Sequence, residues 1–380
     1  MSRRHVWFKL TVPLLALALV VLAIEVALRV AGYNPLQKAT EGTGFFLAAS
    51  ADPDLAYVLV PDTRGRAWGA DISINSLGFR DRDYDHKKPD GAYRILVIGD
   101  SITFGNRMLV ADTYPEQLEA MCVEADRRVE VLNMGVGGYD PLNEVALLER
   151  RGQDLAPDRV VVGYCINDAG VQSANLSIIR FLEQQPALVR ASRLVQLVSV
   201  RIDRTAQARD FQESNREDVF ERRYEDRIRP LDDDPEIREL IAAVDRYIEA
   251  HPPGPRLPYA SWYASTARVG RIRYAFERLR DLAAQGAYEV TVLIIPLLDE
   301  EGHAPLYDGV YAIVEHEARR VGFDVVSARP TFQAAGMQNL ALLRGRHPDP
   351  LHPNAAAHEM LARLLYDHLF AKDARDNRTR

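Results

Sequence analysis

The feature that most constrains the fold is an alternation of short apolar runs with amphipathic stretches, which begins near Ala92. The apolar runs are rich in valine and isoleucine and lie at 94–98, 129–132, 159–164, 289–295 and 323–326. Stretches with helical spacing lie between or after them, at 113–125, 141–152, 266–284, 308–320 and 355–370. Strands that are apolar on both faces and alternate with helices predict a parallel sheet with helices on both sides.

The first thirty residues differ from the rest because they have the pattern of a membrane helix. Residues 10–24 carry no charge, and apolar neighbours lengthen the run to about the 20 residues that a bilayer requires. Three basic residues precede the run and only Arg29 closely follows it, so the positive-inside bias places the amino end in the cytoplasm. We expect an uncleaved anchor. A cleavable signal peptide is the alternative, and both place the chain after residue 30 outside the cytoplasm.

Composition and net charge indicate an ordinary globular protein and give no sign of a nucleic-acid partner. The chain has 380 residues and is 47% hydrophobic and 27% charged, as in an ordinary globular protein. Its net charge of −7 gives no reason to expect a nucleic-acid partner. An oxidising compartment permits the only two cysteines, Cys122 and Cys165, to pair. We expect two separate packed thiols instead, since one falls on a predicted helix and the other ends a buried strand.

Polar residues gather where the predicted strands end. "GDS" follows the first strand at 99–101, "NMGVGG" follows the second at 133–138, "ND" follows the third at 167–168, and "DPLH" precedes the last helix at 349–352. The carboxyl ends of parallel strands meet at one edge of the sheet, where ligands bind in such folds. Each segment alone is explained by a turn or a helix cap. Together, and in this order, they predict one chemical site.

These segments resemble the sequence blocks of the SGNH hydrolases, also called the GDSL esterase/lipase family. Ser101 matches the block I serine, Gly138 the block II glycine, Asn167 the block III asparagine and His352 the block V histidine, with Asp349 three residues ahead. "INSLGFRD" at 74–81 and the N-terminal anchor resemble the membrane-anchored bacterial branch. The resemblance implies the SGNH hydrolase fold, a three-layer α/β/α sandwich with a five-stranded parallel sheet of flavodoxin-like order.

The chemistry of ester cleavage fits these residue types. A serine hydroxyl is a poor nucleophile until a base takes its proton, and His352 is the expected base for Ser101. Asp349 is expected to accept the imidazole N–H, fix its tautomer and stabilise the imidazolium. The resemblance implies an oxyanion hole built from the backbone N–H groups of Ser101 and Gly138 and the side-chain amide of Asn167.

The spacing of residues excludes two other functional motifs, one catalytic and one nucleotide-binding. The G-x-S-x-G elbow of α/β hydrolases requires glycine at position 103, which is threonine. A G-x-G-x-x-G dinucleotide loop that starts at Gly135 places Asp140 at its sixth position, where a carboxylate is a poor neighbour for pyrophosphate.

The expected domains follow from these assignments. Residues 1–30 form the membrane anchor or signal anchor, 31–91 an extracytoplasmic linker with short strands, 92–372 the hydrolase domain and 373–380 a disordered tail. Within the hydrolase domain, 172–260 is a helical and charged insertion. Its residues 201–234 carry dense mixed charge, which is typical of a solvated or mobile excursion. Its apolar stretch 178–200 is consistent with a cap over the site, a helix at the membrane surface or a helix packed on its own domain.

We expect an extracytoplasmic serine esterase that hydrolyses carboxylic esters, O-acetyl or short acyl, through an acyl-Ser101 intermediate. Two alternatives stay open: an O-acetyltransferase acting on cell-envelope or exported polysaccharide, and a non-catalytic glycan-binding envelope component. The expected partners are a small-molecule or glycan ester and, through the N-terminal helix, the membrane, with the catalytic domain on the periplasmic side. No organic cofactor or metal is expected: His347, Asp349 and His352 are ligand types, but no second histidine cluster completes such a site.

Overall fold

The structure is a computed structural model of the chain. It describes residues 3–39, 45–52, 54–55, 57–170, 179, 183, 185–200, 227–228, 231, 233–251, 259–300 and 302–376. Most of the stretch expected to be a charged excursion, residues 201–226, lies outside the described residues.

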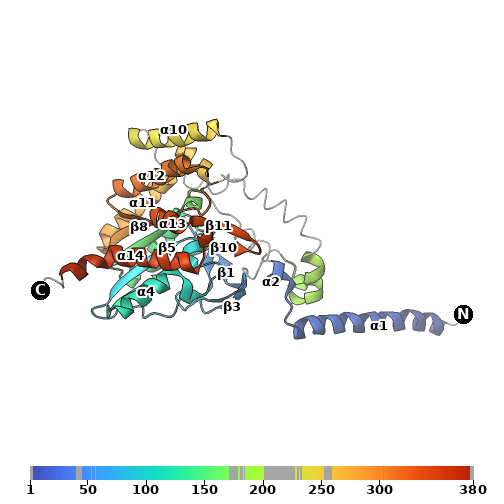
Figure 1. Cartoon of the computed structure of the whole chain (residues 1–380). Helices are drawn as coiled ribbons and strands as arrows, with labels where there is room; N and C mark the ends of the chain where they lie inside the picture. The colour runs from blue at the N-terminus through green and yellow to red at the C-terminus, as the bar shows by residue number, and fades with distance from the viewer. Residues whose placement is uncertain are drawn as a thin grey trace.

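A five-stranded parallel sheet forms the centre of the molecule (Figure 1). Its strands are β5 (Tyr93–Gly99), β6 (Val129–Asn133), β7 (Arg159–Cys165), β8 (Glu289–Ile295) and β9 (Asp324–Ser327). They lie in the order β6-β5-β7-β8-β9, with every neighbouring pair parallel. This is the flavodoxin-like order, which confirms the predicted fold class. The chain order reverses between β5 and β7, so the crevice for ligands is expected at the carboxyl ends of these two strands.

Helices cover both faces of the sheet because alternate residues of each strand point to opposite sides. Ile95 and Val97 of β5 share a buried core with α4 (Tyr114–Glu124), α13 (Arg329–Ala335) and α14 (Ala355–Asp376). Leu96 and Ile98 share the other core with α5 (Pro141–Leu147), α10 (Pro235–Ala250), α11 (Thr266–Gly286) and α12 (Ala304–Arg320). The short turns are η2 (Val110–Asp112), η3 (Leu148–Gly152), η4 (Gln153–Leu155), η5 (Ile166–Ala169), η6 (Ala260–Ala264) and η7 (Met337–Leu340).

The segment before the sheet contributes to the same core. It forms β1 (Leu47–Ala49), β2 (Tyr57–Leu59), β3 (Arg64–Ala67) and β4 (Ala70–Ser73), paired as two antiparallel ribbons, β1 with β2 and β3 with β4. Phe46, Tyr57 and Phe79 are buried together with Phe104 and Leu132 of the sheet domain. The ribbons therefore fold onto the domain that follows them.

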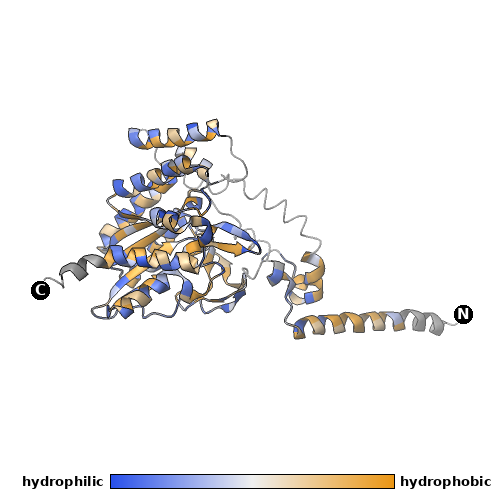
Figure 2. Cartoon of the chain, viewed as in Figure 1, coloured by the Kyte–Doolittle hydropathy of each residue, from blue (hydrophilic) through white to orange (hydrophobic). Residues whose placement is uncertain are grey.

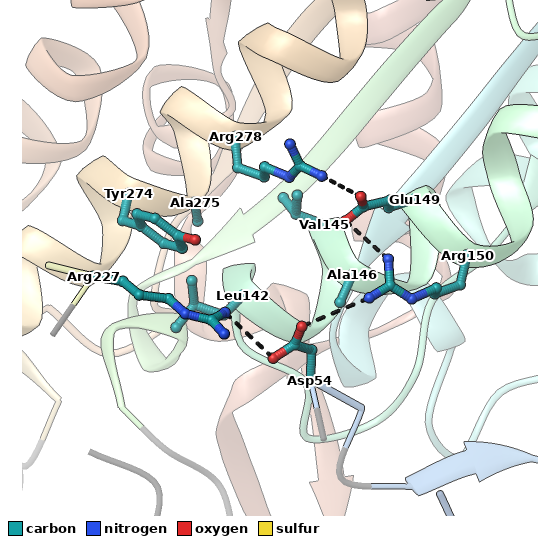
Figure 3. A pocket seen from close by; sticks show the side chains of 10 residues that line it. All are labelled: Asp54, Leu142, Val145, Ala146, Glu149, Arg150, Arg227, Tyr274, Ala275 and Arg278. Atoms are coloured by element: carbon teal, nitrogen blue, oxygen red, sulfur yellow. Dashed lines mark hydrogen bonds and ion pairs between the residues drawn. The ribbon is translucent and has the colours of Figure 1, made fainter. Parts of the chain in front are cut away.

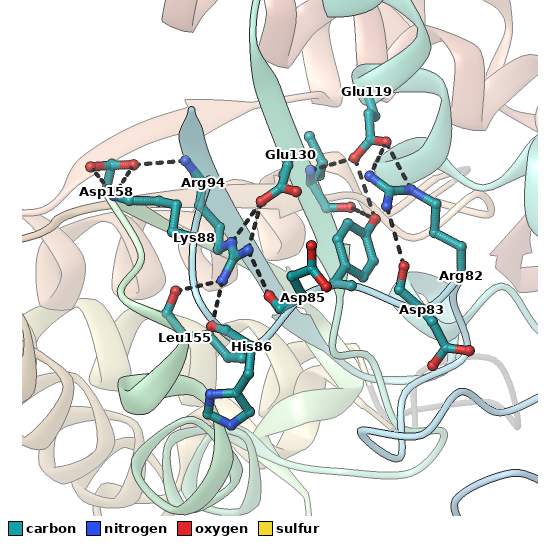
Figure 4. Close-up of polar contacts among 12 residues, drawn as sticks. Arg82, Asp83, Asp85, His86, Lys88, Arg94, Glu119, Glu130, Leu155 and Asp158 are labelled. Atoms are coloured by element: carbon teal, nitrogen blue, oxygen red, sulfur yellow. Dashed lines mark hydrogen bonds and ion pairs between the residues drawn. The ribbon is translucent and has the colours of Figure 1, made fainter. Parts of the chain in front are cut away.

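Polar contacts attach Asp85 and His86, which precede the sheet, to the start of β5 (Figure 4). Arg94 is fully buried and donates hydrogen bonds to the Glu130 carboxylate (2.8 Å) and to three backbone carbonyls, those of Asp85, His86 and Leu155. A buried charge is tolerated only when it is paired and hydrogen-bonded, so these partners fix the path of the chain as it enters the sheet.

The local sequence explains where two of these elements end. The strand β4 ends at Ser73, because the Asn75 side chain accepts the N–H groups of Leu77 and Phe79 and so closes a turn. The last helix, α14, continues to Asp376, and its sequence contains no glycine or proline to end it earlier.

Among the described residues, one helical stretch is long and apolar enough to cross a membrane, Thr11–Val30 within α1 (Arg3–Val30). Figure 2 shows it as a largely hydrophobic rod that projects from the rest of the molecule. A signal sequence would have the same length and composition. The short helix α2 (Pro35–Ala39) follows α1 in the chain. Two helical segments of the insertion, α7 (Ala187–Ala191) and residues 193–200, lie beside the carboxyl end of α1 (Figure 1).

Candidate active site

Ser101 lies at the carboxyl end of β5, where the strand turns directly into the short helix α3 (Ser101–Phe104). The Asp100 carboxylate caps this helix by accepting the N–H of Ile102 (2.8 Å). Glycine is required at position 99, because a Cβ there would lie 2.1 Å from the Thr103 hydroxyl oxygen. Ser101 is only 7% exposed, so its hydroxyl is largely shielded from bulk water.

The fold brings His352 to Ser101 from 251 residues away. The Ser101 Oγ lies 2.9 Å from His352 Nε2, and His352 Nδ1 lies 2.9 Å from the Asp349 Oδ2. Both residues belong to β11 (His347–Pro353), which pairs with β10 (Ala341–Arg344) as an antiparallel hairpin. When Nδ1 carries the proton and donates a hydrogen bond to the Asp349 carboxylate, Nε2 is free to accept the serine proton.

Several donors surround the Asp349 carboxylate, which is 4% exposed. Burial by itself would raise the pKa of this carboxyl. The hydrogen bond and charge of His352, the Leu351 N–H (3.1 Å) and the charge of Arg344 outweigh burial and hold the pKa well below its usual range. The Arg344 Nε contacts Asp349 at 2.5 Å. The carboxylate that faces the imidazole is therefore ionised at neutral pH.

The remaining predicted residues lie on the sheet side of Ser101. Asn167 is the second residue of η5, the turn after β7. Its Nδ2 donates to Asp100 Oδ2 (2.8 Å), an oxygen that is also 3.3 Å from Ser101 Oγ. Gly138 follows β6 in a left-handed conformation (φ +80°), which favours glycine. A Cβ on its neighbour Gly137 would lie 3.8 Å from the Ser101 Cβ. No described acceptor contacts the backbone N–H of Ser101 or Gly138.

Two side chains from the N-terminal segment support these loops: Arg80 of the "INSLGFRD" segment, for which the sequence left open a ligand contact or a link between this segment and the domain, and Tyr57, which the sequence did not single out. Arg80 is fully buried and donates to four carbonyls, those of Asp71, Phe104, Gly105 and Met108, three of which belong to the loop after Ser101. Although burial lowers its pKa to about 10, the guanidinium stays charged at neutral pH. Tyr57 donates its hydroxyl proton to the Gly137 carbonyl (2.7 Å), and the Tyr139 hydroxyl donates to the Tyr57 carbonyl. A local sequence pattern cannot show these contacts, because the partners lie 9 to 82 residues away.

Two carboxyl groups lie in the core near Asp100. Glu144 is 1% exposed and neither of its oxygens has a hydrogen-bond partner among the described residues. Asp168 is 2% exposed, and only its Oδ2 is bonded, by the Cys165 N–H (2.7 Å). Burial, followed by the charge of Asp100, raises the pKa of both carboxyls well above the usual range. We expect both groups to be protonated at neutral pH.

Other histidines and cysteines lie apart from this constellation. His358, six residues after His352, is buried and accepts the Tyr114 N–H at Nδ1 (3.1 Å); burial lowers its pKa to about 3. His368 contacts Asp324 on the surface. Cys122 and Cys165 are both buried and free, which confirms that they do not pair.

One other cluster has the residue types of a metal site. In the described part of the chain, Asp234, His316 and Glu317 offer ligand atoms within 4.8 Å of one another. The Arg273 guanidinium already contacts both carboxylates, at 2.5 Å and 2.6 Å. A cation therefore already occupies the place that a metal ion would take.

A separate pocket of about 220 Å³ opens between α5 and α11 (Figure 3). Its polar lining is arranged in ion pairs, with Arg150 and Arg227 on Asp54 and Arg278 on Glu149. It includes none of the predicted site residues.

One comparison with known proteins identifies a family. The model of the GDSL-like Lipase/Acylhydrolase family matches residues 97–360. A search of curated proteins finds no match.

Among solved structures, an α/β hydrolase from the metagenome of Lake Arreo, Spain, is 14% identical with a TM-score of 0.39, over 72% of this chain and 94% of that one. The acetyl xylan esterase AlAXEase is 12% identical with a TM-score of 0.38, over 73% and 100%. The acetylxylan esterase Axe2 of Geobacillus stearothermophilus is 15% identical with a TM-score of 0.38, over 72% and 93%. On the family match, which spans more than half of its length, the chain belongs to the GDSL-like lipase/acylhydrolase (SGNH) family of carboxylic ester hydrolases.

Proposed function

We propose that the protein is a membrane-anchored serine esterase that hydrolyses O-acetyl or other short acyl esters, with Ser101 as nucleophile. The observation that carries this proposal is the continuous contact from the Ser101 hydroxyl through the His352 imidazole to the Asp349 carboxylate, with both distances at 2.9 Å. A histidine so placed between a hydroxyl and an ionised carboxylate is a general base for that hydroxyl.

The proposed reaction has two steps. Ser101 Oγ attacks the ester carbonyl while its proton passes to His352 Nε2, and the imidazolium then protonates the departing alcohol. In the second step the same imidazole takes a proton from a water molecule, whose oxygen attacks the acyl-Ser101 carbonyl. The imidazolium then returns that proton to Ser101 Oγ as the carboxylic acid leaves. The charge that develops on the carbonyl oxygen in each step is stabilised by the N–H groups of Ser101 and Gly138 and the amide of Asn167.

Asp100 has a positioning role in this proposal. Its carboxylate holds one N–H of the Asn167 amide at 2.8 Å, which leaves the second N–H for the substrate oxygen. The free backbone N–H groups of Ser101 and Gly138 supply the other two donors.

The proposed location is the outer face of a cell membrane. Residues 1–30 would form the anchor with its basic amino end in the cytoplasm, residues 31–91 the connection to the anchor, and residues 92–372 the hydrolase domain with its insertion. The substrate would then be an ester of the cell envelope or of an exported polysaccharide.

The test is hydrolysis of p-nitrophenyl acetate, with longer acyl chains as a series, by the full chain in detergent. We expect Ser101→Ala to lower turnover by on the order of 10⁶, as loss of a triad serine does. Equal rates for the two proteins would reject Ser101 as nucleophile. The same reaction with an added oligosaccharide acceptor distinguishes release of acetate, which the proposal expects, from transfer of acetyl to the sugar.

A further inference from the structure

Glu25 is unusual because it places a carboxylate inside the apolar stretch of α1. Apart from Arg29 it is the only charged residue between Leu10 and Val30. It lies five residues before Val30, which is about 7.5 Å along the helix axis. An ionisable group at that depth of a membrane helix is costly unless a specific partner satisfies it.

The structure supplies that partner from the insertion. Glu25 accepts the backbone N–H groups of Arg193 (3.0 Å) and Leu194 (2.9 Å) and the hydroxyl of Ser192 (3.0 Å). One turn further along α1, Arg29 donates to the Ala191 carbonyl (2.6 Å) and to Glu25 itself (2.7 Å). Glu25 therefore caps the first turn of the helix at 193–200, where the helix dipole favours a negative charge.

Apolar contacts extend this attachment to α2. Val189 and Val200 are buried against Leu36 of α2, and Val195 packs beside them. The described part of the segment, residues 185–200, is thus joined to the chain just after the membrane helix by both polar and apolar contacts. Figure 1 shows these two short helices, in yellow-green, beside the end of α1 that faces the folded domain.

The outward surface of this segment has the composition of a membrane-interface element. Leu188 and Val198 are 68% and 51% exposed, although the segment also contains buried valines. The only charged residues in 185–200 are Arg190 and Arg193, so the segment is basic. Exposed apolar residues flanked by arginine suit the boundary between acyl chains and anionic head groups.

We propose that residues 185–200 form an interfacial element that Glu25 and Arg29 hold at the level where α1 leaves the membrane. Leu188 and Val198 enter the acyl boundary, and the two arginines contact lipid phosphates. The partner is the bilayer itself, argued from continuity with the exposed apolar surface of Thr11–Val30. This inference rests on the proposed membrane anchoring of α1 and is independent of the proposed chemistry at Ser101.

The consequence is a second attachment of the chain to the membrane, beside the anchor itself. The element attaches the insertion to the membrane end of the molecule, so the domain has a second connection to the bilayer beside the anchor. Of the three expectations for 178–200, the contacts of residues 185–200 favour the helix at the membrane surface.

The test uses the full chain in vesicles of phosphatidylethanolamine and phosphatidylglycerol that carry a spin-labelled lipid quencher. A fluorophore is attached to Leu188→Cys or Val198→Cys, and Val123→Cys on α4, which is 63% exposed, is the matched control. The native cysteines are buried, and the unsubstituted chain measures any label they take up. We expect severalfold stronger quenching at 188 and 198 than at 123.

The outcomes separate the inference from the anchor. A chain that floats with the vesicles but shows equal quenching at 188, 198 and 123 overturns the inference and leaves the anchor intact. A chain that does not float overturns both. In a Glu25→Leu background we expect quenching at 198 to fall toward the value at 123, and unchanged quenching would contradict the role of Glu25.

Discussion

The two sides of Ser101 contain carboxyl groups that are similarly buried but have pKa values shifted in opposite directions. On the hairpin side, Asp349 is 4% exposed and ionised, whereas on the core side Glu144 and Asp168, at 1% and 2%, have raised pKa values. Burial therefore does not decide the difference. Asp349 has an imidazole, a backbone N–H and a guanidinium as partners, while both Glu144 oxygens lack one among the described residues. The charge of a buried carboxyl depends on its donors.

The largest expected effect comes from neutralising the hairpin side. In Asp349→Asn the imidazole loses the charge that holds its proton on Nδ1, so we expect kcat to fall by about 10⁴. Ester hydrolysis by the purified variant measures this, and circular dichroism verifies its fold. A loss of less than about tenfold would contradict the assigned role.

The next largest effect concerns the amide on the core side. Asn167→Ala removes one proposed donor to the developing oxyanion, so we expect kcat to fall by about 10²–10³. Asn143→Ala is the matched control, because that amide donates to the Asp54 carbonyl outside the site. Comparable losses in both variants would show that the first effect is structural.

The stability of the fold should depend on Arg80, the buried arginine that binds the carbonyls after Ser101. Lysine at position 80 keeps the charge but cannot reach all four carbonyls, so we expect Arg80→Lys to lower the free energy of unfolding by about 2–3 kcal/mol. Arg82→Lys is the control, because Arg82 is 47% exposed and pairs with Glu119, which is worth at most about 1 kcal/mol. Urea unfolding should give a lower midpoint for Arg80→Lys than for Arg82→Lys. Equal midpoints would contradict the stabilising role of Arg80.

Acid should destabilise the fold through His358. Its pKa is about 3 in the folded protein and about 6.5 when unfolded, so between these values the unfolded state binds more protons. Stability is therefore expected to fall with decreasing pH across this window, by up to about 1.4 kcal/mol per pH unit. His358→Asn, which keeps an acceptor for the Tyr114 N–H, should flatten the slope measured by urea unfolding at pH 7 and pH 5. A slope as steep as that of the wild type would mean that His358 does not titrate there.

The smallest effect is expected on the core side. Burial raises the pKa of Glu144, which favours its neutral form, and Glu144→Gln replaces it with a neutral amide of similar shape. We therefore expect changes below about 1 kcal/mol in stability and little loss of kcat. The contrast with Asp349→Asn, the same type of substitution on the other side of Ser101, is the sharpest form of the comparison. A large loss of stability in Glu144→Gln would show that the carboxyl is ionised in the folded protein.

Local patterns predicted the sheet because each strand carries its own signal. The valine and isoleucine runs identify all five strands, and the D-x-x-H spacing brings Asp349 and His352 onto one hairpin without long-range information. The parallel arrangement then places Ser101 and Asn167 at one edge. These inferences require only the periodicity of apolar residues and the rule that the carboxyl ends of parallel strands lie at one edge of the sheet.

The sequence alone could not show which distant side chains hold the loops of the site in place. The role of Arg80 stayed open between a ligand contact and a link from its segment to the domain, and Glu144 resembled a carboxylate on the surface of a helix, because the burial of both depends on segments that fold over them. Tyr57 reaches Gly137 across 80 residues. The docking of 185–200 on Glu25 has the same origin, a contact between segments separated by more than 160 residues.

The most direct test of the central claim is covalent trapping of the nucleophile. A fluorophosphonate reacts with a serine hydroxyl only when a base has activated it, and mass spectrometry of the digested protein identifies the residue that carries the adduct. The account predicts a single adduct on Ser101, absent from Ser101→Ala and slowed severely in His352→Ala. An adduct on another residue, or an active enzyme that takes up no label at Ser101, would contradict it.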